Sequence, residues 1–318
     1  MQCNAIALQK CNTPTIAIVV KSSKKARLNC GTVFLIIKGT LKKDVIMESQ
    51  QINKSKSGVK VFLQGFVESI SAKLETSIIN ARPKDCRVVY GPYESFEHGT
   101  VLVLDNMPKK SCTYNCRYCN EAETVCCTTE LGTCVSSYAM SFFVGKELEK
   151  LKKEGVKIDA LLMAPHGEAT LDGNLFEQIG MLRQYNLPIA VYSNSSLLWN
   201  ERMIENLRFA DSVTLKIDTV FEETWRELNR PNSRLKLNKI LDGMMDFAAK
   251  FDGKLSTRTT LTQGYNCKEE ELEGLADFLN KLKPDTAFFY PCKKGVDSIS
   301  TIKKVLENRL DPSINLRI

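Results

Sequence analysis

The 318-residue sequence has few histidines and no long apolar segment, and both shortages exclude classes of protein. Only two histidines are present, which weakens any zinc site built from mixed cysteine and histidine ligands. No apolar run approaches the roughly 18 residues of a membrane-spanning helix, so we expect none. The N-terminal stretch MQCNAIALQKCNTP lacks a basic start followed by a long apolar run. We therefore expect no secretory signal.

Cysteine, in contrast, is abundant, with 12 residues. In a short secreted chain this number would predict a disulfide framework. This chain is long and groups its thiols, so metal ligation in a reducing compartment fits better. We expect a cytoplasmic protein.

The net charge of +7 is unevenly distributed along the chain. Residues 1–90 carry 15 Lys and Arg against 5 Asp and Glu, whereas the remainder carries 29 against 32. The basic N-terminal part predicts either an ordinary solvated surface or contact with RNA or another acidic partner. Aromatic residues do not strengthen the RNA interpretation, because TIAIVVKSSKKARLNCGTVFLIIKG contains a single Phe.

Two sequence patterns divide the chain into regions. Residues 1–88 predict a small β-rich domain, because short β-branched runs alternate with Lys, Ser and Gly clusters. These runs are TIAIVV, TVFLII, DVIME and VKVFLQGFV. In residues 89–318 strands and helices alternate, which predicts a parallel sheet with helices outside it. The segment ARPKD marks the expected boundary between the two.

The second region predicts an α/β fold of the partial-barrel kind. Six strands are expected, at 100–105, 158–164, 188–193, 212–217, 254–261 and 286–290. Helices with a 3.6-residue apolar period are expected at SFFVGKELEKLKKEG, NLFEQIGMLRQY, NERMIENLRF, RLKLNKILDGMMDFAAKF, KEEELEGLADFLNKL and TIKKVLENRL. Six strand–helix repeats are too few for a complete eight-stranded barrel and indicate a partial (β/α)6 barrel. Chemistry in such folds lies at the C-terminal ends of the strands.

The segment SCTYNCRYCN, residues 111–120, follows the first of these strands. It contains Cys112, Cys116 and Cys119 at C-x3-C-x2-C spacing. Thiolates favour zinc or iron–sulfur clusters, and three thiolates leave one iron of a four-iron cluster open for a substrate or cofactor. The alternative is zinc with a distant fourth cysteine, although zinc sites more often use two C-x2-C pairs.

With Tyr118 before the last cysteine, this motif resembles that of the radical S-adenosylmethionine (radical SAM) superfamily, and the resemblance extends over residues 88–292. It implies that Cys112, Cys116 and Cys119 hold a [4Fe–4S] cluster whose open iron binds the amino and carboxylate groups of S-adenosylmethionine. It also implies reductive cleavage of this cofactor to a 5′-deoxyadenosyl radical, which abstracts hydrogen from a substrate. An electron donor such as flavodoxin or ferredoxin is the implied partner. Tyr118 is expected near the adenine.

A second matching segment, MAPHGEATLDGN, ends the second predicted strand and resembles the G-G-E-P motif of the family. The resemblance implies that Gly167 and Glu168 contact the methionine amino group. Two positions depart from the motif, because His166 replaces its first glycine and Ala169 replaces its proline. For His166, a polar residue without a catalytic role is the simpler interpretation.

Segments at the ends of the next two strands also match. YSNSSLL resembles T-N-G-T-L and implies that Ser193 and Asn194 bind the ribose or the methionine carboxylate. Helix capping by the serines at 195 and 196 is an alternative or additional role. LKIDTVFEETWRELNRP places Lys216 where the cofactor carboxylate is expected in the family. A Lys inside an apolar strand at this edge of the sheet favours function in its own right.

The fifth strand carries RTTLTQGYN, which resembles R-T-T-L-V-K-G-I-N. Arg258 is expected to point into or along the barrel, and Thr260 to line the pocket. A purely structural role for either residue is the alternative.

The combination of motifs also resembles the wyosine-forming tRNA enzymes and a group of related Fe–S oxidoreductases. Those tRNA enzymes carry a second cluster on N-terminal cysteines. This chain has three cysteines there, although at a different spacing: Cys3, Cys11 and Cys30. They predict either a second iron–sulfur cluster or ordinary thiols.

The remaining cysteines carry weaker signals. A group directly after the main motif predicts an inert loop or, alternatively, a redox or metal role: Cys126, Cys127 and Cys134. Among the isolated thiols, Cys292 at the end of the sixth strand is the best placed to face the pocket.

These observations predict a radical SAM enzyme that cleaves S-adenosylmethionine and acts on an unidentified substrate. One alternative is a tRNA-modifying enzyme of the wyosine type, which the basic N-terminal part favours. Another is a non-catalytic iron–sulfur or zinc protein. The cofactor-binding motifs after three further strands argue against that last alternative.

Overall fold

The computed structural model describes residues 87–107, 110–121, 123–292 and 295–318, together with three short strands nearer the N-terminus. The chain divides into two compact units, Met1–Ala81 and Arg82–Ile318. In the first unit, an antiparallel sheet consists of β1 (Ala17–Lys21), β2 (Phe34–Lys38) and β3 (Val45–Ile46).

These three strands coincide with three of the β-branched runs in the sequence. The fourth run, VKVFLQGFV, lies outside the described residues. The predicted domain limits of 1–88 and 89–318 stay a prediction, because residues 47–86, which precede the expected boundary, also lie outside the described residues.

An eight-stranded sheet is the frame of the second unit, with the strand order β13-β12-β11-β10-β9-β8-β5-β4. Neighbouring strands run parallel, except that β4 pairs antiparallel with β5. The strands are β4 (Val89–Ser95), β5 (Gly99–Leu104), β8 (Ala160–Met163), β9 (Ile189–Ser193), β10 (Ser212–Lys216), β11 (Lys254–Leu261), β12 (Thr286–Pro291) and β13 (Asn315–Arg317).

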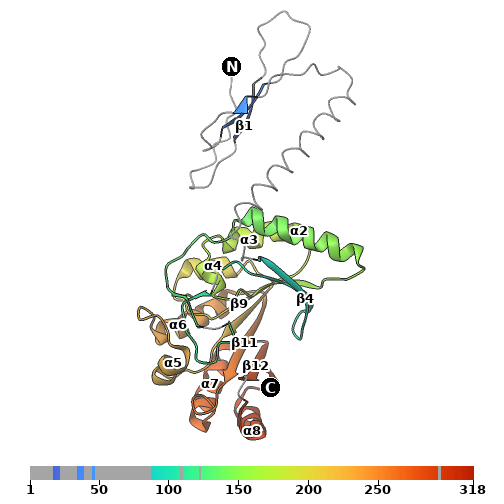
Figure 1. The fold of residues 1–318 in the computed structure, drawn as a ribbon. Helices are drawn as coiled ribbons and strands as arrows, with labels where there is room; N and C mark the ends of the chain where they lie inside the picture. The colour runs from blue at the N-terminus through green and yellow to red at the C-terminus, as the bar shows by residue number, and fades with distance from the viewer. Residues whose placement is uncertain are drawn as a thin grey trace, which may run out of the picture. The chain divides into compact units, whose positions relative to one another are not determined.

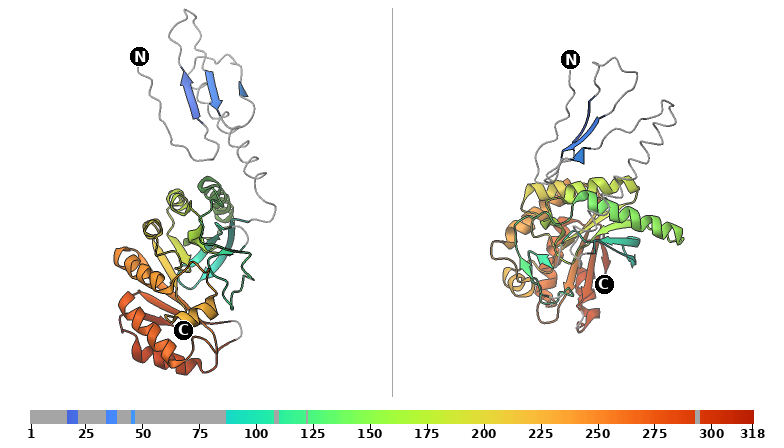
Figure 2. Two further views of the ribbon diagram at one scale, coloured as in Figure 1. Left: turned by 90° about the vertical axis from the view of Figure 1, so that its left-hand side faces the viewer. Right: turned by 45° about the horizontal axis from the view of Figure 1, so that its top comes forward.

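The helices lie along one face of this curved sheet and leave the other face to the interior of the partial barrel (Figures 1 and 2). They are α2 (Ser137–Lys153), α3 (Leu175–Leu182), α4 (Glu201–Leu207), α5 (Glu222–Asn229), α6 (Leu237–Lys250), α7 (Glu269–Leu282) and α8 (Ile299–Arg309). None of the helices in the described part of the chain combines the length and the apolar character that a membrane span requires.

This architecture confirms the predicted α/β partial barrel. All six predicted strands are present and stand next to one another in the sheet in chain order, as β5, β8, β9, β10, β11 and β12. The edge strands β4 and β13 and helix α5 were not predicted. The sequence of β4, VYGPYES, is only partly buried and contains a Gly-Pro pair, so it lacks the apolar run that marks the central strands.

Strand side chains alternate between two hydrophobic layers, as the two-residue period of a strand requires. On β8, Leu161 and Met163 belong to the large core between sheet and helices. Ala160 and Leu162, from the same strand, belong to a small cluster that also includes Val101. The alternation places a second set of side chains, some of them polar, on the inner face of the sheet.

The turn between β4 and β5 closes part of that inner face. Glu97 in this turn accepts hydrogen bonds from Thr214 Oγ1 at 3.2 Å and from the Tyr192 hydroxyl at 3.4 Å. The neighbouring Phe96 packs edge-on against Phe288, with ring centroids 6.3 Å apart. The hairpin therefore reaches strands on the far side of the sheet.

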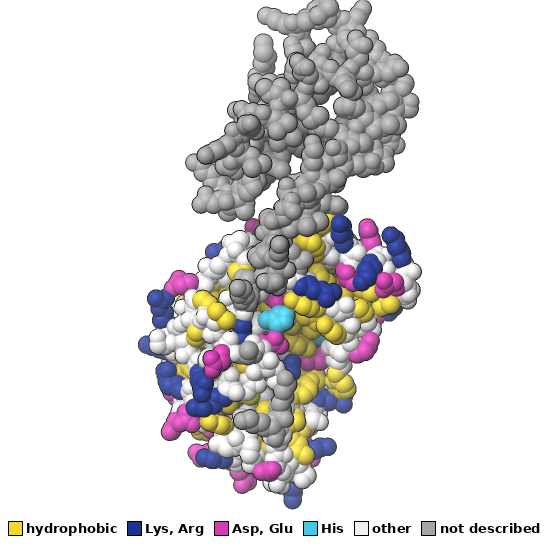
Figure 3. Space-filling view, in the orientation of Figure 1, with side chains coloured by type: hydrophobic (Ala, Val, Ile, Leu, Met, Phe, Trp, Pro, Cys, Tyr) yellow, Lys and Arg dark blue, Asp and Glu magenta, His cyan; other side chains and the backbone are white. Residues whose placement is uncertain are grey.

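On the face shown in Figure 3, basic and acidic side chains are interspersed over the described part of the chain. This mixture agrees with the nearly balanced 29 basic and 32 acidic residues beyond residue 90.

Candidate functional site

The three-cysteine loop follows β5 and is fastened to the rest of the barrel by main-chain hydrogen bonds. Ser111 and Cys112 form the short strand β6 (Ser111–Cys112), which pairs with β7 (Cys126–Cys127). Farther along the loop, the Arg117 amide donates to the Leu228 carbonyl at 2.9 Å. The loop is thus held at one end by its own return segment and at the other by helix α5.

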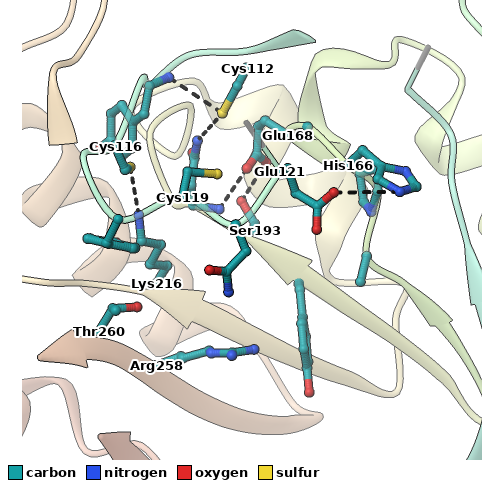
Figure 4. Close-up of a pocket in the computed structure, with 18 of the residues that line it drawn as sticks. Cys112, Cys116, Cys119, Glu121, His166, Glu168, Ser193, Lys216, Arg258 and Thr260 are labelled. Carbon is teal, nitrogen blue, oxygen red and sulfur yellow. Dashed lines mark hydrogen bonds and ion pairs between the residues drawn. The ribbon is translucent and has the colours of Figure 1, made fainter. Parts of the chain in front are cut away.

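Cys112, Cys116 and Cys119 all line one pocket at the C-terminal ends of the parallel strands, which confirms the expected edge of the sheet. The cavity measures about 380 Å³, within the usual range for a small-molecule site. Figure 4 shows the three thiols on one side of this pocket, with Arg258 and Thr260 on the other.

The donor set fits an iron–sulfur cluster better than a single metal ion. Among the described residues, no three Cys, His, Asp or Glu side chains converge on one ion position. A cluster does not need that convergence, because each thiolate bonds a different iron. Burial raises the pKa of Cys112 to about 12, so its thiolate needs a cationic ligand in order to form at neutral pH.

Polar side chains from three other segments already contact the sulfurs. Lys216 Nζ lies 3.1 Å from the Cys116 sulfur, and the Asn229 side-chain amide lies 3.4 Å from the same atom. The Asn194 amide donates to the Cys112 sulfur at 3.4 Å. Hydrogen bonds to cluster sulfurs are one of the means by which a protein sets a reduction potential.

A buried carboxylate, that of Asp218, connects the cysteine loop to two strands and a helix. It accepts from the Tyr118 hydroxyl, from the Asn229 amide at 2.6 Å and from the Thr260 main-chain N–H at 2.9 Å. Thr260 donates to Oδ1, whereas Tyr118 and Asn229 donate to Oδ2. Lys216 Nζ lies 3.1 Å from Oδ2. Each donor satisfies part of a charge that would be costly to bury alone.

The electrostatics of this network favour a charged Lys216. Burial opposes the ammonium form, but the Asp218 carboxylate and the Cys116 sulfur outweigh it and raise the pKa of Lys216 above its ordinary value. Burial, with Asp218 beside it, also raises the pKa of the Tyr118 hydroxyl. The Tyr118 ring faces Lys216, whose ammonium lies 5.0 Å from the ring centroid. Tyr118 therefore acts here as a neutral hydrogen-bond donor.

Gly167 and Glu168, at the end of β8, pack directly against the start of the cysteine loop. The Glu168 N–H donates to the Ser111 carbonyl at 3.0 Å. The Glu168 side chain is 2% exposed, and its Oε1 accepts from Thr170 and from Ser193 Oγ at 2.8 Å. Its Oε2 accepts from the Asn194 N–H at 2.7 Å. A carboxylate oxygen can accept two hydrogen bonds, so Oε2 retains room for a further donor.

Ser193 and Asn194, at the end of β9, also line the pocket, and their contact with the cofactor stays a prediction. The proposed helix-capping role of the serines at 195 and 196 is wrong, because α4 begins at Glu201 and Asn200 caps it. Ser195 instead donates to the Lys216 carbonyl at 3.0 Å. The chain between 194 and 200 forms turns before the helix starts. Leu197 and Leu198 in these turns are buried and apolar, so the sequence did not indicate a turn there.

His166 forms a pair that the sequence did not reveal. Its Nδ1 is hydrogen-bonded to the buried carboxylate of Asp105, which follows β5. This hydrogen bond raises the pKa of His166, and burial raises the pKa of Asp105. His166 Nε2 lies 3.6 Å from Glu121 on the cysteine loop. Asp105 was predicted only as the last residue of a strand, and the signal for its role is a carboxylate directly after an apolar run.

The side of the pocket opposite the cysteines consists of strand residues that share the inner face of the sheet. They are Tyr192, Thr214, Arg258, Thr260 and Tyr290. Arg258 stands opposite Lys216 in the β10–β11 register and opposite Phe288 in the β11–β12 register. The structure thus places both Arg258 and Thr260 in the pocket.

The other cysteines differ in their relation to the site. Cys292 lines the pocket, as expected. Cys126 and Cys127 are exposed and Cys134 is half-buried, and none of the three is among the pocket residues. Cys3, Cys11 and Cys30, the candidate ligands of a second cluster, lie outside the described residues.

Comparison with known proteins identifies the architecture. No protein-family model matches the chain. The fold is similar to that of TYW1 with a lysine–pyruvate adduct bound (15% identity, TM-score 0.52, 68% of this chain and 76% of that chain). It is also similar to a radical SAM methyltransferase from Sphaerobacter thermophilus (11% identity, TM-score 0.54, 94% of this chain and 76% of that chain). The chain therefore has the fold of the radical SAM enzymes, as its motifs predicted.

A curated relative lies nearer in sequence. The chain is 37% identical over 201 residues to a UPF0026 protein of Methanocaldococcus jannaschii. The match covers 63% of this chain and 62% of the relative, so the chain spans less than two thirds of that protein's length.

Proposed function

We propose that this protein is a radical SAM enzyme. Cys112, Cys116 and Cys119 would hold a [4Fe–4S] cluster, and S-adenosylmethionine would occupy the pocket beside it. The observation that carries the proposal is the meeting of these three thiols with Glu168, Asn194 and Lys216 in one pocket. A cluster with one open iron, when bound, supplies the electron that cleaves the sulfonium of the cofactor. The reaction class that follows is hydrogen abstraction from a substrate.

The polar residues around the pocket support binding of the methionine part of the cofactor. Glu168 Oε2 accepts one hydrogen bond, from the Asn194 N–H, and has room for an ammonium donor. Lys216, with its pKa raised, presents a cation to a carboxylate. Opposite charges on two sides of a site match the zwitterionic end of an amino acid. Tyr118, Gly167 and Ser193 complete this wall of the pocket, with Tyr118 assigned to the adenine.

Metal analysis and turnover of anaerobically reconstituted protein test the proposal. We expect about four irons per chain and, after reduction with dithionite, formation of 5′-deoxyadenosine from S-adenosylmethionine. Cys116→Ser should lose the iron and the cleavage. Cys126→Ser is the matched control, because its thiol is exposed and outside the pocket, and it should retain both. Tightly bound zinc without any cleavage of S-adenosylmethionine would refute the enzymatic function and indicate a zinc-binding protein instead.

A tRNA-modifying role of the wyosine type is the second candidate, favoured by the 15 basic and 5 acidic residues of segment 1–90. Electrostatic contact with RNA predicts binding that weakens steeply with salt. Titration of tRNA at two salt concentrations, with the full chain, checks this. Absent binding, or binding insensitive to salt, would contradict the tRNA-modifying role but would not affect the proposed radical SAM function.

The proposal includes a cytoplasmic location and an electron donor such as flavodoxin or ferredoxin. A second cluster on Cys3, Cys11 and Cys30 would raise the iron content to about eight per chain. Replacing all three with serine would then return it to about four. An unchanged content in that variant would remove the second cluster from the proposal.

A further inference from the structure

Arg258 presents a guanidinium to the pocket from the side opposite the three cysteines (Figure 4). We propose that it binds an oxyanion of the substrate, a carboxylate or a phosphate, and so fixes the substrate at the far end of the pocket from the cluster. This inference rests on the proposed radical SAM function, because it divides one pocket between cofactor and substrate.

The backbone aims Arg258 inward. Residues two apart on a strand share a face, and Arg258 and Thr260 on β11 both line the pocket. Thr214 and Lys216 do the same on the neighbouring β10, in parallel register with β11. Arg258 therefore lies on the inner face of the sheet, and its guanidinium lies near the rings of Tyr192 and Tyr290.

Two tyrosines hold the guanidinium. Its central carbon lies 4.6 Å from the centroid of the Tyr290 ring and 5.9 Å from that of Tyr192. A guanidinium that lies over an aromatic ring keeps its edge N–H groups available, and those groups form the fork that binds a carboxylate or phosphate with two hydrogen bonds. The aromatic contacts thus orient Arg258 without satisfying its donors.

In the described part of the chain, no carboxylate forms an ion pair with Arg258, and its guanidinium donates no hydrogen bond to another described residue. Arginines elsewhere on the barrel differ. Arg309 is paired with Asp277 at 2.7 Å, and Arg183 with Asp211 at 3.3 Å. A guanidinium that is oriented but unpaired inside a cavity is a ready site for an anionic group.

The charge of Glu97 interacts with that of Arg258, but the hydrogen bonds found for the Glu97 carboxylate go to other residues. Its carboxylate accepts from Thr214 and Tyr192 on the inner face of the sheet. Burial raises the pKa of Glu97, which weakens the repulsion that it would exert on a bound anion.

Division of labour between Lys216 and Arg258 follows from their surroundings. Lys216 lies 3.1 Å from the Cys116 sulfur and is paired with Asp218, so it belongs to the cluster end of the pocket. Arg258 is surrounded by tyrosines, which suit a flat or partly apolar molecule next to an anionic group. The two cations therefore suit two different anions, the cofactor carboxylate at Lys216 and the substrate oxyanion at Arg258.

Protection of Arg258 from phenylglyoxal tests this assignment without requiring turnover. The full reconstituted chain would be treated with the reagent, and modification of each arginine would be followed by peptide mass spectrometry. Inorganic phosphate, benzoate and S-adenosylmethionine would be added separately, with neutral benzamide as the isosteric control for benzoate. Arg226, an exposed arginine paired with Glu222 on helix α5, serves as the internal reference.

We expect phosphate or benzoate to slow modification of Arg258 by about fivefold or more at saturation, with Arg226 unaffected. The arm that protects more strongly tells a phosphate substrate from a carboxylate substrate. No protection by either anion would overturn the oxyanion site, and so would equal protection by benzoate and benzamide when phosphate gives none. Protection by S-adenosylmethionine alone would assign Arg258 to the cofactor and also overturn it.

The two proposals fail separately in these experiments. If reduced protein forms no 5′-deoxyadenosine, the radical SAM function fails whatever Arg258 binds. If cleavage proceeds but Arg258 is unprotected, only the substrate site fails. Arg258→Lys adds a second measurement, because a lysine keeps the charge but loses the two-pronged geometry, and its protein should bind benzoate about tenfold more weakly by calorimetry. Equal binding by both proteins would contradict the assignment.

Discussion

Gly167 approaches Ser111 so closely that a β-carbon on Gly167 would lie 1.9 Å from the Ser111 carbonyl oxygen. The same carbonyl accepts the Glu168 N–H at 3.0 Å. The end of β8 is therefore locked against the residue that precedes Cys112, and only glycine permits it. The glycine of the H-G-E segment has a steric role that is independent of any cofactor.

We expect Gly167→Ala to lower the free energy of unfolding by at least about 2 kcal/mol, because the clash is with backbone and neither segment can yield cheaply. Urea unfolding of the apo chain measures this loss, and iron retention after reconstitution should fall with it. Gly180→Ala is the control, since Gly180 lies in helix α3 with nothing within 4 Å of the added carbon. That variant should gain up to about 1 kcal/mol. Similar stabilities for the two variants would contradict the close packing of Gly167 against Ser111.

Loss of the Asp218 carboxylate should be more harmful than loss of Lys216. Asp218→Ala leaves the Lys216 ammonium unpaired and removes an acceptor from Tyr118 and Asn229, so we expect a loss of about 3–5 kcal/mol. Lys216→Met leaves Asp218 with its other donors and should cost about 1–2 kcal/mol.

Denaturant unfolding of both variants checks that order. The surface pair of Asp277 and Arg309 supplies the control, because Asp277→Ala removes a solvent-exposed partner and should change stability much less. A smaller loss for Asp218→Ala than for Lys216→Met would mean that the carboxylate is not the centre of the network.

Lys216 should also affect the redox chemistry of the loaded protein. Its ammonium lies 3.1 Å from the Cys116 sulfur, and a nearby cation favours the reduced, more negative state of a cluster. We expect Lys216→Met to lower the cluster reduction potential by on the order of 50 mV, measured by anaerobic redox titration. The exposed Lys157→Met is the matched control and should leave the potential unchanged. An unaltered or higher potential in Lys216→Met would contradict the contact.

The pKa values of the two histidines should shift in opposite directions from that of a free imidazole. A hydrogen bond to Asp105 raises the pKa of His166, whereas burial lowers the pKa of His98. Nitrogen-detected NMR of the apo chain should resolve two imidazoles, one titrating above 6.5 and one below, and His166→Gln should remove the upper one. Two curves near 6.5, or loss of the lower one in that variant, would contradict the Asp105 pair.

The effect on stability has a definite sign. The His166 contribution is fully present below pH 6.5 and disappears as the pH rises through its raised folded value. Because the His166 side chain is 45% exposed, we expect no more than about 0.5 kcal/mol after solvent screening. The difference in unfolding free energy between the parent and His166→Gln should therefore shrink as pH rises.

Local sequence signals were sufficient for the central strands and for the three-cysteine loop. The six inner strands are short apolar runs that alternate with segments of 3.6-residue apolar period. The thiols of Cys112, Cys116 and Cys119 are close in the chain. Both features therefore depend only on residues that are near one another in the sequence. The resemblance to the radical SAM motifs selected Glu168, Asn194 and Lys216, and the structure places these three residues in one pocket.

Contacts between distant segments were not predictable in this way. The partners of Asp218 lie up to 100 residues away in the chain, and nothing local distinguishes this aspartate from a loop residue. The helix NERMIENLRF was predicted close to its observed start, but its cap was assigned to the serines at 195 and 196, which are also typical capping residues, and not to Asn200. Helix α5 was missed because it is short and largely charged, with Trp225 and Leu228 as its main buried apolar residues.

The sulfur contacts have a consequence for the order in which the protein is made. Side chains that donate to Cys112 and Cys116 are those of Asn194, Lys216 and Asn229, which lie 82, 100 and 113 residues further along the chain. The thiols leave the ribosome well before these neighbours do, and domains fold as units once their segments are available. The surroundings of the Cys112 and Cys116 sulfurs described above are therefore complete only after Asn229 has been synthesised.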